Sequence, residues 1–361
     1  MNSKERVLVS VEHEEPDFVP LTDHIYMQKS LEGILGERGV RTNTPEKYVK
    51  VHHILGLDLI CAFPGRLADT TVQSCDASTG VMVREGESVD EWGIKQKDID
   101  GMGWYLEGAI KSPEDADRFD VPDPYLPWRV ETVREIVKLA KDELAIAGIV
   151  SGPFTRGLLL FGFTNYMRAL YVAPNAVQRV TEKVTRFEIE LGKVIIDMGV
   201  DIVWIPDDLG MKDGPFLSPQ SFRKRVFPCM KKMVETFKKR GVRVLLHCDG
   251  QIMPLMDDIV QMGFDGVHPI ERKAGMNLDV MKKEYGDKLT LIGNVDATEL
   301  LPHGTSLQIK KQVLECLRIA APGGGYILAS DHSIHEGVRS ANAMFMFKAA
   351  KKYGRHPLRY A

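Results

Sequence analysis

Short apolar runs that alternate with helical patterns are the feature of this sequence that most restricts its fold. From about residue 112 onward, at least six such runs end abruptly at polar residues, and each is followed by a helical segment. Strands that alternate with helices are typical of a parallel sheet with right-handed crossovers. Two earlier runs, near residues 18 and 58, bring the number to eight. Eight strand–helix units predict an α/β fold of the (β/α)8 TIM-barrel class.

An open, doubly wound sheet is the alternative fold. It is disfavoured because no Gly-x-Gly-x-x-Gly motif follows an early strand, so the usual dinucleotide signal is missing. We therefore predict one barrel domain over residues 1–361. Residues 66–112 do not follow the alternation of strands and helices. Val81–Arg84 and Glu91–Lys95 predict short antiparallel strands there, and we expect this part to form an amino-terminal cap of helical and β-hairpin character.

Charge and composition narrow the partners and the compartment. The net charge is -3 and no long basic run occurs, which argues against nucleic acid as a partner. No window approaches the roughly 18 apolar residues of a membrane span, and the amino terminus lacks an apolar signal core. The five cysteines are odd in number and form no CxxC pair, which favours free thiols in a reducing compartment. We expect a soluble cytoplasmic protein.

Residues 242–252 show most clearly where chemistry is placed. An apolar, partly β-branched run of Val242, Val244, Leu245 and Leu246 predicts a strand buried on both faces. His247, Cys248 and Asp249 follow it directly. Because side chains alternate along a strand, His247 and Asp249 are expected on one face and Cys248 on the other. An imidazole and a carboxylate placed in this way can share one metal ion or one proton.

In a barrel, the carboxyl ends of the strands converge on one mouth, so residues far apart in sequence become neighbours. The polar residues at these ends are Ser151, Asp207, Asp208, His247, Asp249, Glu271, Asn294, Asp296, Asp331 and His332. Most of them are acids or histidines. Such a group needs a cation or a proton network to satisfy it.

The sharpest interpretation is a divalent metal held by His247, Asp249 and His332, with Glu271 as a fourth ligand or supporting partner. Nitrogen and oxygen donors around an open position suit catalytic zinc. Other readings stay open: His247 could be a core histidine and Asp249 a helix cap, Glu271 could pair with its basic neighbours, and His335 competes with His332.

The remaining candidates concern acid–base chemistry and substrate binding. Two adjacent carboxylates, Asp207 and Asp208, favour a general acid or base, although they could also cap the following loop. For Asn294 and for Asp296, substrate contact and a structural role in the loop are equally expected. Ser151 is a further candidate for substrate contact, and Phe154 could line an aromatic wall.

Several of these segments together resemble the uroporphyrinogen decarboxylase superfamily. They are His-Cys-Asp-Gly at 247–250, Gly-Phe-Asp-Gly-Val-His-Pro-Ile-Glu at 263–271, Lys-Ala-Gly-Met at 273–276, Gly-Asn-Val-Asp at 293–296 and Pro-Gly-Gly-Gly-Tyr-Ile-Leu at 322–328. Asp-Glu-Trp-Gly at 90–93 and Asp-Asp-Leu-Gly at 207–210 extend the resemblance over nearly the whole chain. It implies a barrel fold.

The resemblance also separates two branches of the superfamily. Decarboxylases of that name carry an arginine-rich segment near the amino terminus that clamps substrate carboxylates, whereas residues 20–26 here contain no arginine. The other branch comprises corrinoid-dependent methyltransferases that bind zinc at the mouth. In its thiol-methylating members the ligands look like His-x-Cys plus a later Cys. Asp249 and His332 stand where those two cysteines would be, so both soft donors are replaced by harder ones.

A harder site favours an oxygen-bound methyl donor over a thiolate. The resemblance therefore implies the methyltransferase component of an O-demethylase, which transfers the methyl group of a methoxylated aromatic compound to the Co(I) cobamide of a separate corrinoid protein. The alternatives are a methylcobamide:thiol methyltransferase, a metal-free decarboxylase of a small aromatic acid and a corrinoid carrier subunit. The carrier is disfavoured because no Asp-x-His-x-x-Gly loop occurs. Barrels of this superfamily often pair, so a homodimer is an expectation.

Overall fold

Seven parallel strands form the centre of the molecule. The computed structural model describes residues 1–25, 27–37, 44–65, 81–84, 87–99 and 102–358. Within them the sheet order is β1-β6-β7-β10-β11-β12-β13. The strands are β1 (Leu59–Ala62), β6 (Ala145–Ile149), β7 (Ile202–Pro206), β10 (Arg243–His247), β11 (Gly266–His268), β12 (Thr290–Val295) and β13 (Tyr326–Ser330). Nearly every strand residue is buried, as the uninterrupted apolar runs predict.

A short segment at residues 20–22 occupies the eighth position of the barrel. On one side, the Leu328 N–H donates to the Pro20 carbonyl (2.9 Å), and the Thr22 N–H donates to the Leu328 carbonyl (3.1 Å). On the other side, the Asp58 N–H, immediately before β1, donates to the Leu21 carbonyl (2.7 Å). The segment therefore links β13 to β1. The predicted α/β barrel is confirmed, and its first strand is only a bridge in length.

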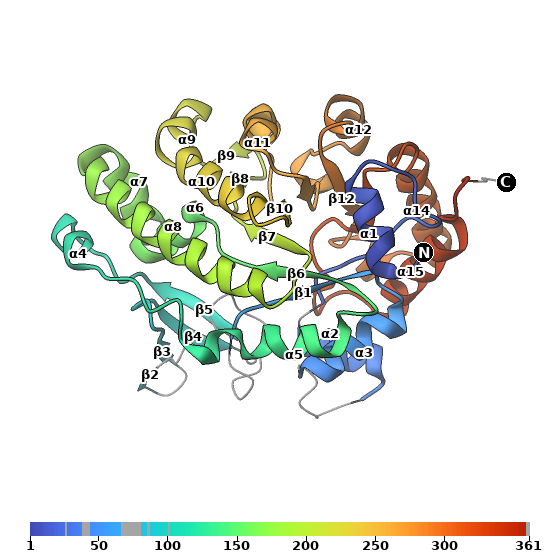
Figure 1. Cartoon of the computed structure of the whole chain (residues 1–361), viewed down its shortest axis with the longest axis horizontal. Coiled ribbons are helices and arrows are strands. Elements are labelled where there is room, and N and C mark those ends of the chain that lie inside the picture. Colours follow the sequence, from blue (N-terminus) through green and yellow to red (C-terminus); the bar gives the residue numbers. More distant parts are fainter. Residues whose placement is uncertain (26, 38–43, 66–80, 85–86, 100–101, 359–361) are drawn as a thin grey trace.

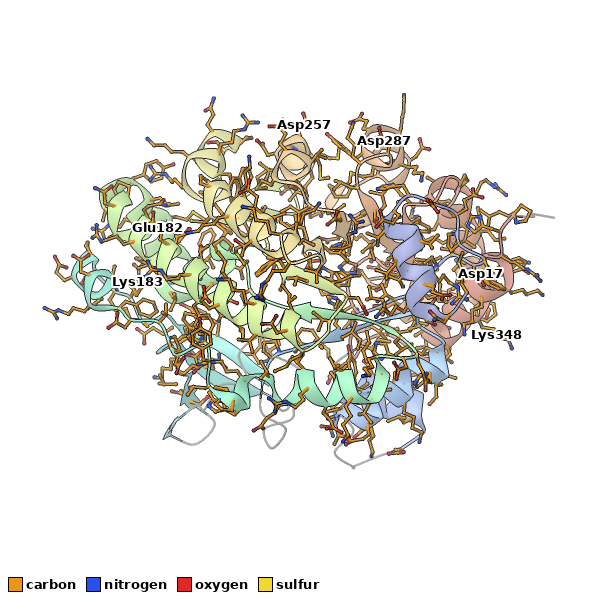
Figure 2. The ribbon with its side chains drawn as sticks, viewed as in Figure 1. Asp17, Glu182, Lys183, Asp257, Asp287 and Lys348 are labelled. Atoms are coloured by element: carbon orange, nitrogen blue, oxygen red, sulfur yellow. The ribbon has the colours of Figure 1, made fainter. Side chains whose placement is uncertain are left out.

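Helices surround the strands on the outside of the barrel (Figure 1). They are α1 (Ser3–Val11), α2 (Gln28–Leu35), α3 (Pro45–Leu55), α4 (Pro113–Arg118), α5 (Glu131–Ala140), α6 (Pro153–Phe161), α7 (Phe163–Val172), α8 (Pro174–Asp197), α9 (Pro219–Arg225), α10 (Phe227–Lys238), α11 (Met256–Met262), α12 (Leu278–Tyr285), α13 (Leu300–His303), α14 (Ser306–Ala320) and α15 (Ser340–Tyr353). Charged side chains such as Glu182, Lys183 and Asp257 lie on their outer faces (Figure 2). Among the described helices, none is long and apolar enough to cross a membrane.

Local sequence signals account for several helix starts. The predicted start near Thr44-Pro45 is confirmed, because the Thr44 hydroxyl accepts a hydrogen bond from the Lys47 N–H and proline occupies the first turn. Helices α6 and α7 were not predicted from the sequence. Residues Leu158–Phe161 are apolar without interruption, so they give no helical period to detect.

An antiparallel sheet lies in the part of the chain expected to form the cap. Its strands are β2 (Val81–Arg84), β3 (Glu87–Val89), β4 (Lys95–Ile99) and β5 (Met102–Glu107). The prediction of a strand over residues 91–95 is wrong. The Asp90 carboxylate accepts the N–H groups of Trp92 and Ile94, so the chain turns here before β4 begins at Lys95. Residues 66–80 of the predicted cap lie outside the described residues.

Candidate metal and acid–base site

The polar cluster forms where β7, β10 and β11 end side by side. His247 is the last residue of β10, in register with Pro206 of β7 and with His268 of β11. Asp208 and Asp249 lie in the loops that follow β7 and β10. Parallel pairing thus brings three chain segments to one edge of the barrel, as the sequence predicts for strand ends.

Asp249 lies between two imidazoles. Its Oδ2 atom is 3.5 Å from Nε2 of His247 and 3.4 Å from Nε2 of His332, and Nε2 of His247 is 4.0 Å from Oδ1 of Asp208. The ligand atoms of Asp208, His247 and Asp249 all lie within 4.8 Å of one another. Asp249 therefore lies beside both of the other predicted metal ligands. Among the described residues, His247 and Asp249 form a group in mutual ligand reach with Asp208, one of the predicted acid–base carboxylates, whereas His332 contacts this group through Asp249.

These separations suit a tetrahedral cation. With zinc–ligand distances of about 2.0–2.2 Å, neighbouring donors are roughly 3.3–3.5 Å apart. The two nitrogen–oxygen separations at Asp249 fall at that spacing. In addition, no hydrogen-bond partner among the described residues reaches the buried Oδ1 atom of Asp249. A buried carboxylate oxygen without a partner is costly, and a bound cation would remove that cost. Asp249 and its two imidazole neighbours are therefore donors of the kind and spacing that zinc takes, and their assignment as its ligands stays a prediction.

The charges of the cluster respond to one another. Burial by itself would raise the pKa of Asp249, but the charge and hydrogen bond of His247 outweigh burial and lower this pKa to about 2. Burial would lower the pKa of His247, and Asp249 reverses this effect, so the pKa is raised. Burial also raises the pKa of the Asp208 carboxyl against the opposing charge of His247. Asp249 is thus ionised, and of the two side chains the Asp208 carboxyl is the one that keeps its proton to higher pH.

The loop after β13 places His332 and His335 in different surroundings. Nδ1 of His332 bonds to the Ser333 hydroxyl (2.9 Å), which leaves Nε2 facing Asp249. Both ring nitrogens of His335 are used within the loops: Nε2 bonds to the Ala297 carbonyl and Nδ1 accepts the Gly337 N–H, each at 3.0 Å. His332 is the histidine that reaches the cluster.

Two further histidines, absent from the predicted site, lie directly beside His247. Nδ1 of His268 is 2.7 Å from Nδ1 of His247, and the ring of His24 stacks on His247 with centroids 5.2 Å apart. Burial lowers the pKa of His24 to about 3 and that of His268 well below its usual value, so both rings are neutral. The sequence shows that His268 ends an apolar strand, as His247 does, but it does not show that the two residues are paired in the sheet.

Asp207 and Glu271 support the loops around the cluster. The Asp207 carboxylate accepts the N–H groups of Phe154 (3.2 Å) and Thr155 (2.6 Å) at the start of α6, and burial raises its pKa to about 7. Oε2 of Glu271 accepts the Gly250 N–H (2.8 Å), next to Asp249. Asp208 likewise accepts the Asp249 N–H (3.0 Å). Of the adjacent pair, Asp208 is the carboxyl with a 45% exposed side chain, facing the histidines.

The predicted substrate residues occupy different environments. The Ser151 hydroxyl accepts a hydrogen bond from Arg156 (2.8 Å) at the end of β6. Phe154 is fully buried and packs edge-on against Tyr166 and Phe222, with ring centroids 5.5 Å and 5.1 Å away. Their roles in substrate binding stay predictions.

Asn294 and Asp296 differ in the same way. Asn294 is fully buried; its amide donates to the Ile270 carbonyl, and no described residue bonds to its Oδ1 atom. Oδ1 of Asp296 accepts the N–H groups of residues 298–300, which is a loop-forming arrangement. Asn294 therefore keeps a free acceptor near the strand ends, whereas Asp296 is occupied by its own loop.

A cavity of about 530 Å³ lies elsewhere, near the residues that precede β1 and β6. Arg6, Phe18, Asp58 and Leu144 are among the residues that line it. None of its lining residues belongs to the cluster of His247 and Asp249. It opens at the amino ends of the strands, where barrels carry stability rather than chemistry.

Comparisons with known proteins agree with the fold. A family model described as "Uroporphyrinogen decarboxylase (URO-D)" matches residues 89–353. A "Uroporphyrinogen decarboxylase" of Trichlorobacter lovleyi is 24% identical over 309 residues, which cover 80% of this chain and 84% of that protein. A "Methylcobamide:CoM methyltransferase MtaA" of Methanosarcina barkeri is 25% identical over 226 residues, 61% of this chain and 63% of that protein. The solved structure of a "methyltransferase from Methanosarcina mazei" is 20% identical, with a TM-score of 0.74, and the match covers 98% of this chain and 99% of that chain.

Proposed function

This chain belongs to the uroporphyrinogen decarboxylase family, and we propose that it is a methyltransferase that cleaves a methyl ether with the help of a zinc ion at the barrel mouth. The acceptor in this proposal is the Co(I) cobamide of a separate corrinoid protein, and the donor is a methoxylated aromatic compound. Relatives named as methylcobamide methyltransferases support the corrinoid dependence. The donor set at the mouth supports the ether.

One observation carries the proposal: the Asp249 carboxylate lies between the imidazoles of His247 and His332, at separations of 3.5 and 3.4 Å. Imidazole nitrogen and carboxylate oxygen are harder donors than thiolate, and a harder site suits oxygen chemistry better. A zinc ion held there would polarise an ether oxygen as a Lewis acid. We assign His247, Asp249 and His332 as its ligands.

The other residues of the cluster have distinct roles in this proposal. Asp208, with its raised pKa and exposed side chain, holds a proton for the departing oxygen. Asp207 and Glu271 fix the loops that carry Asp208 and Asp249. Ser151, Phe154, Asn294 and Asp296 remain our candidates for substrate contact, and of these the unused Oδ1 atom of Asn294 is the most direct.

The reaction balances without a further reductant. The cobalt centre supplies an electron pair to the methyl carbon, the carbon–oxygen bond breaks, and its pair stays on oxygen. With the proton that Asp208 donates to this oxygen, the products are a phenol, the Asp208 carboxylate and a methylated Co(III) centre. Because a phenolate is a basic leaving group, protonation by Asp208 lowers the barrier.

Metal analysis and a turnover assay test the proposal together. Purified protein should contain about one zinc per chain, and with a reduced corrinoid protein and a methoxybenzoate it should yield methylcobamide and the free phenol. Asp249→Asn should lose both zinc and phenol release. Asp287→Asn is the matched control, because this carboxyl side chain is 75% exposed and lies on the outer surface, in the turn that follows α12.

The assay also separates the competing functions. Methylation of an added thiol by methylcobamide, without ether cleavage, would place the chain with the activity named for its Methanosarcina barkeri relative. Release of carbon dioxide from an aromatic acid without cobalt would support a decarboxylase, the activity named for its Trichlorobacter lovleyi relative. Zinc retained in full by Asp249→Asn would remove this carboxylate from the site.

A further inference from the structure

The contact between His247 and His268 is the least usual feature of the cluster. Their Nδ1 atoms are 2.7 Å apart, which is a hydrogen-bond distance. The two histidines end neighbouring strands and are directly paired in the sheet register. The contact is therefore built into the barrel itself, because both rings start from strand positions that the β10–β11 pairing fixes.

A hydrogen bond between two imidazole nitrogens needs one N–H group and one lone pair. Nε2 of His247 faces the carboxylates, 3.5 Å from Asp249. If this nitrogen gives its lone pair to a cation, the single proton of the neutral ring must lie on Nδ1. That N–H group then points at His268, whose Nδ1 must act as the acceptor.

The ring of His268 is held in place by its neighbours. It is fully buried, and it lies edge-on to Trp204 (centroids 5.1 Å apart, interplanar angle 87°) and 4.9 Å from the ring of His24. His24 in turn stacks on His247. The rings packed on it keep the plane of the His268 ring beside His247.

We propose that His268 is a positioning residue of the zinc site: its Nδ1 atom accepts the Nδ1–H group of His247 and so aims a deprotonated Nε2 atom at the cation. The inference rests on the zinc site proposed above. Metal-bound histidines usually donate their second N–H group to a carboxylate, a carbonyl or water. Here the acceptor is a neutral imidazole, which fixes the tautomer without adding a negative charge near the metal.

Zinc affinity of paired variants tests this role. His268→Leu removes the acceptor, and His268→Asn keeps an oxygen near the former Nδ1 position. Loss of such a partner typically weakens metal binding 10- to 100-fold, so we expect that loss in the leucine variant and a smaller one in the asparagine variant. The measurement is competition with a chromophoric zinc chelator. His52→Leu is the matched control, because His52 is another fully buried histidine, located in α3 and bonded to the Tyr48 carbonyl.

A measurement on the unaltered protein keeps the inference testable even if a variant does not fold. In zinc-loaded protein with 15N-labelled histidine, nuclear magnetic resonance should show a slowly exchanging proton on Nδ1 of His247, coupled to Nδ1 of His268. A His247 ring that carries its proton on Nε2 would overturn the inference. Unchanged zinc affinity in a folded His268→Leu variant would overturn it as well.

These outcomes are distinct from failure of the proposed function. If the wild-type chain binds zinc and cleaves the ether, and His268→Leu also binds zinc with full affinity, only the role of His268 is refuted. If the wild-type chain binds no zinc, the proposed zinc site and the role of His268 are both refuted.

Discussion

Replacement of Arg156 by methionine should destabilise the barrel strongly. Arg156 and Glu188 form an ion pair (3.6 Å) in which both side chains are only 2% exposed. The guanidinium group also bonds to the Ser151 hydroxyl and lies 4.6 Å from the ring of Trp92. Removing one partner of a buried pair takes a compensating charge away from the other, which typically costs about 3–5 kcal/mol. We expect Arg156→Met to lose stability in that range.

The second variant shows whether the lost charge is the cause. Glu188 also accepts the Ser151 N–H (3.0 Å), and glutamine at this position keeps an acceptor while removing the charge. The double variant Arg156→Met/Glu188→Gln should therefore recover most of the loss, to within about 1–2 kcal/mol of wild type. Urea unfolding followed by circular dichroism measures both values.

The control is an exposed ion pair. Arg179 pairs with Asp117, and their side chains are 49% and 57% exposed. Arg179→Met should change the free energy of unfolding by less than about 1 kcal/mol. The reasoning fails if Arg156→Met costs no more than this control, or if the double variant is as unstable as the sum of its single changes.

Three further predictions concern pH, the thiol and metal removal. Burial lowers the pKa of His52 to about 4. Between pH 6.5 and 4 the unfolded chain therefore binds more protons than the folded one, and the free energy of unfolding falls as the pH falls. In urea unfolding, His52→Leu should reduce the loss of this free energy between pH 7 and pH 5 by about 2 kcal/mol. Cys248→Ala should keep zinc binding, measured by chelator competition, because its thiol accepts the Leu209 N–H and is not one of the three ligands; a loss of zinc would place the thiol in the site. Stripping zinc with a chelator should lower the free energy of unfolding by about 2.7 kcal/mol relative to protein with free zinc at 100 times its dissociation constant, and equal unfolding curves would contradict a zinc site in the folded protein.

The barrel could be predicted because its signals are local. Apolar runs such as Leu144–Val150 and the polar residues that end them are visible without any knowledge of packing. The same reasoning placed His247 and Asp249 on one face, and in the structure Asp249 contacts both His247 and His332. The segment at 20–22 could be predicted only roughly, since its strand is a single bridge.

The histidine neighbours of His247 could not be predicted from these signals. Whether His268 meets His247 depends on the register between β10 and β11, and the sequence of either strand does not show that register. The choice of His332 over His335 depends on loop hydrogen bonds to Ala297 and Gly337, which likewise have no sequence signature. Which histidines meet at the site thus depends on strand register and loop hydrogen bonds, which the periodicity of the sequence does not show.

The loop that presents Asp249 is held by its backbone, with consequences for how the site can change. The Asp249 N–H is bound by Asp208 and the next N–H, of Gly250, is bound by Glu271, so neighbouring strands fix the main chain from both sides. Neither hydrogen bond involves the side chain at position 249. A cysteine introduced there would inherit the same anchoring and present sulfur where oxygen now stands. Replacement of this one residue would then exchange a hard donor for a soft one at the barrel mouth and leave the fold unchanged.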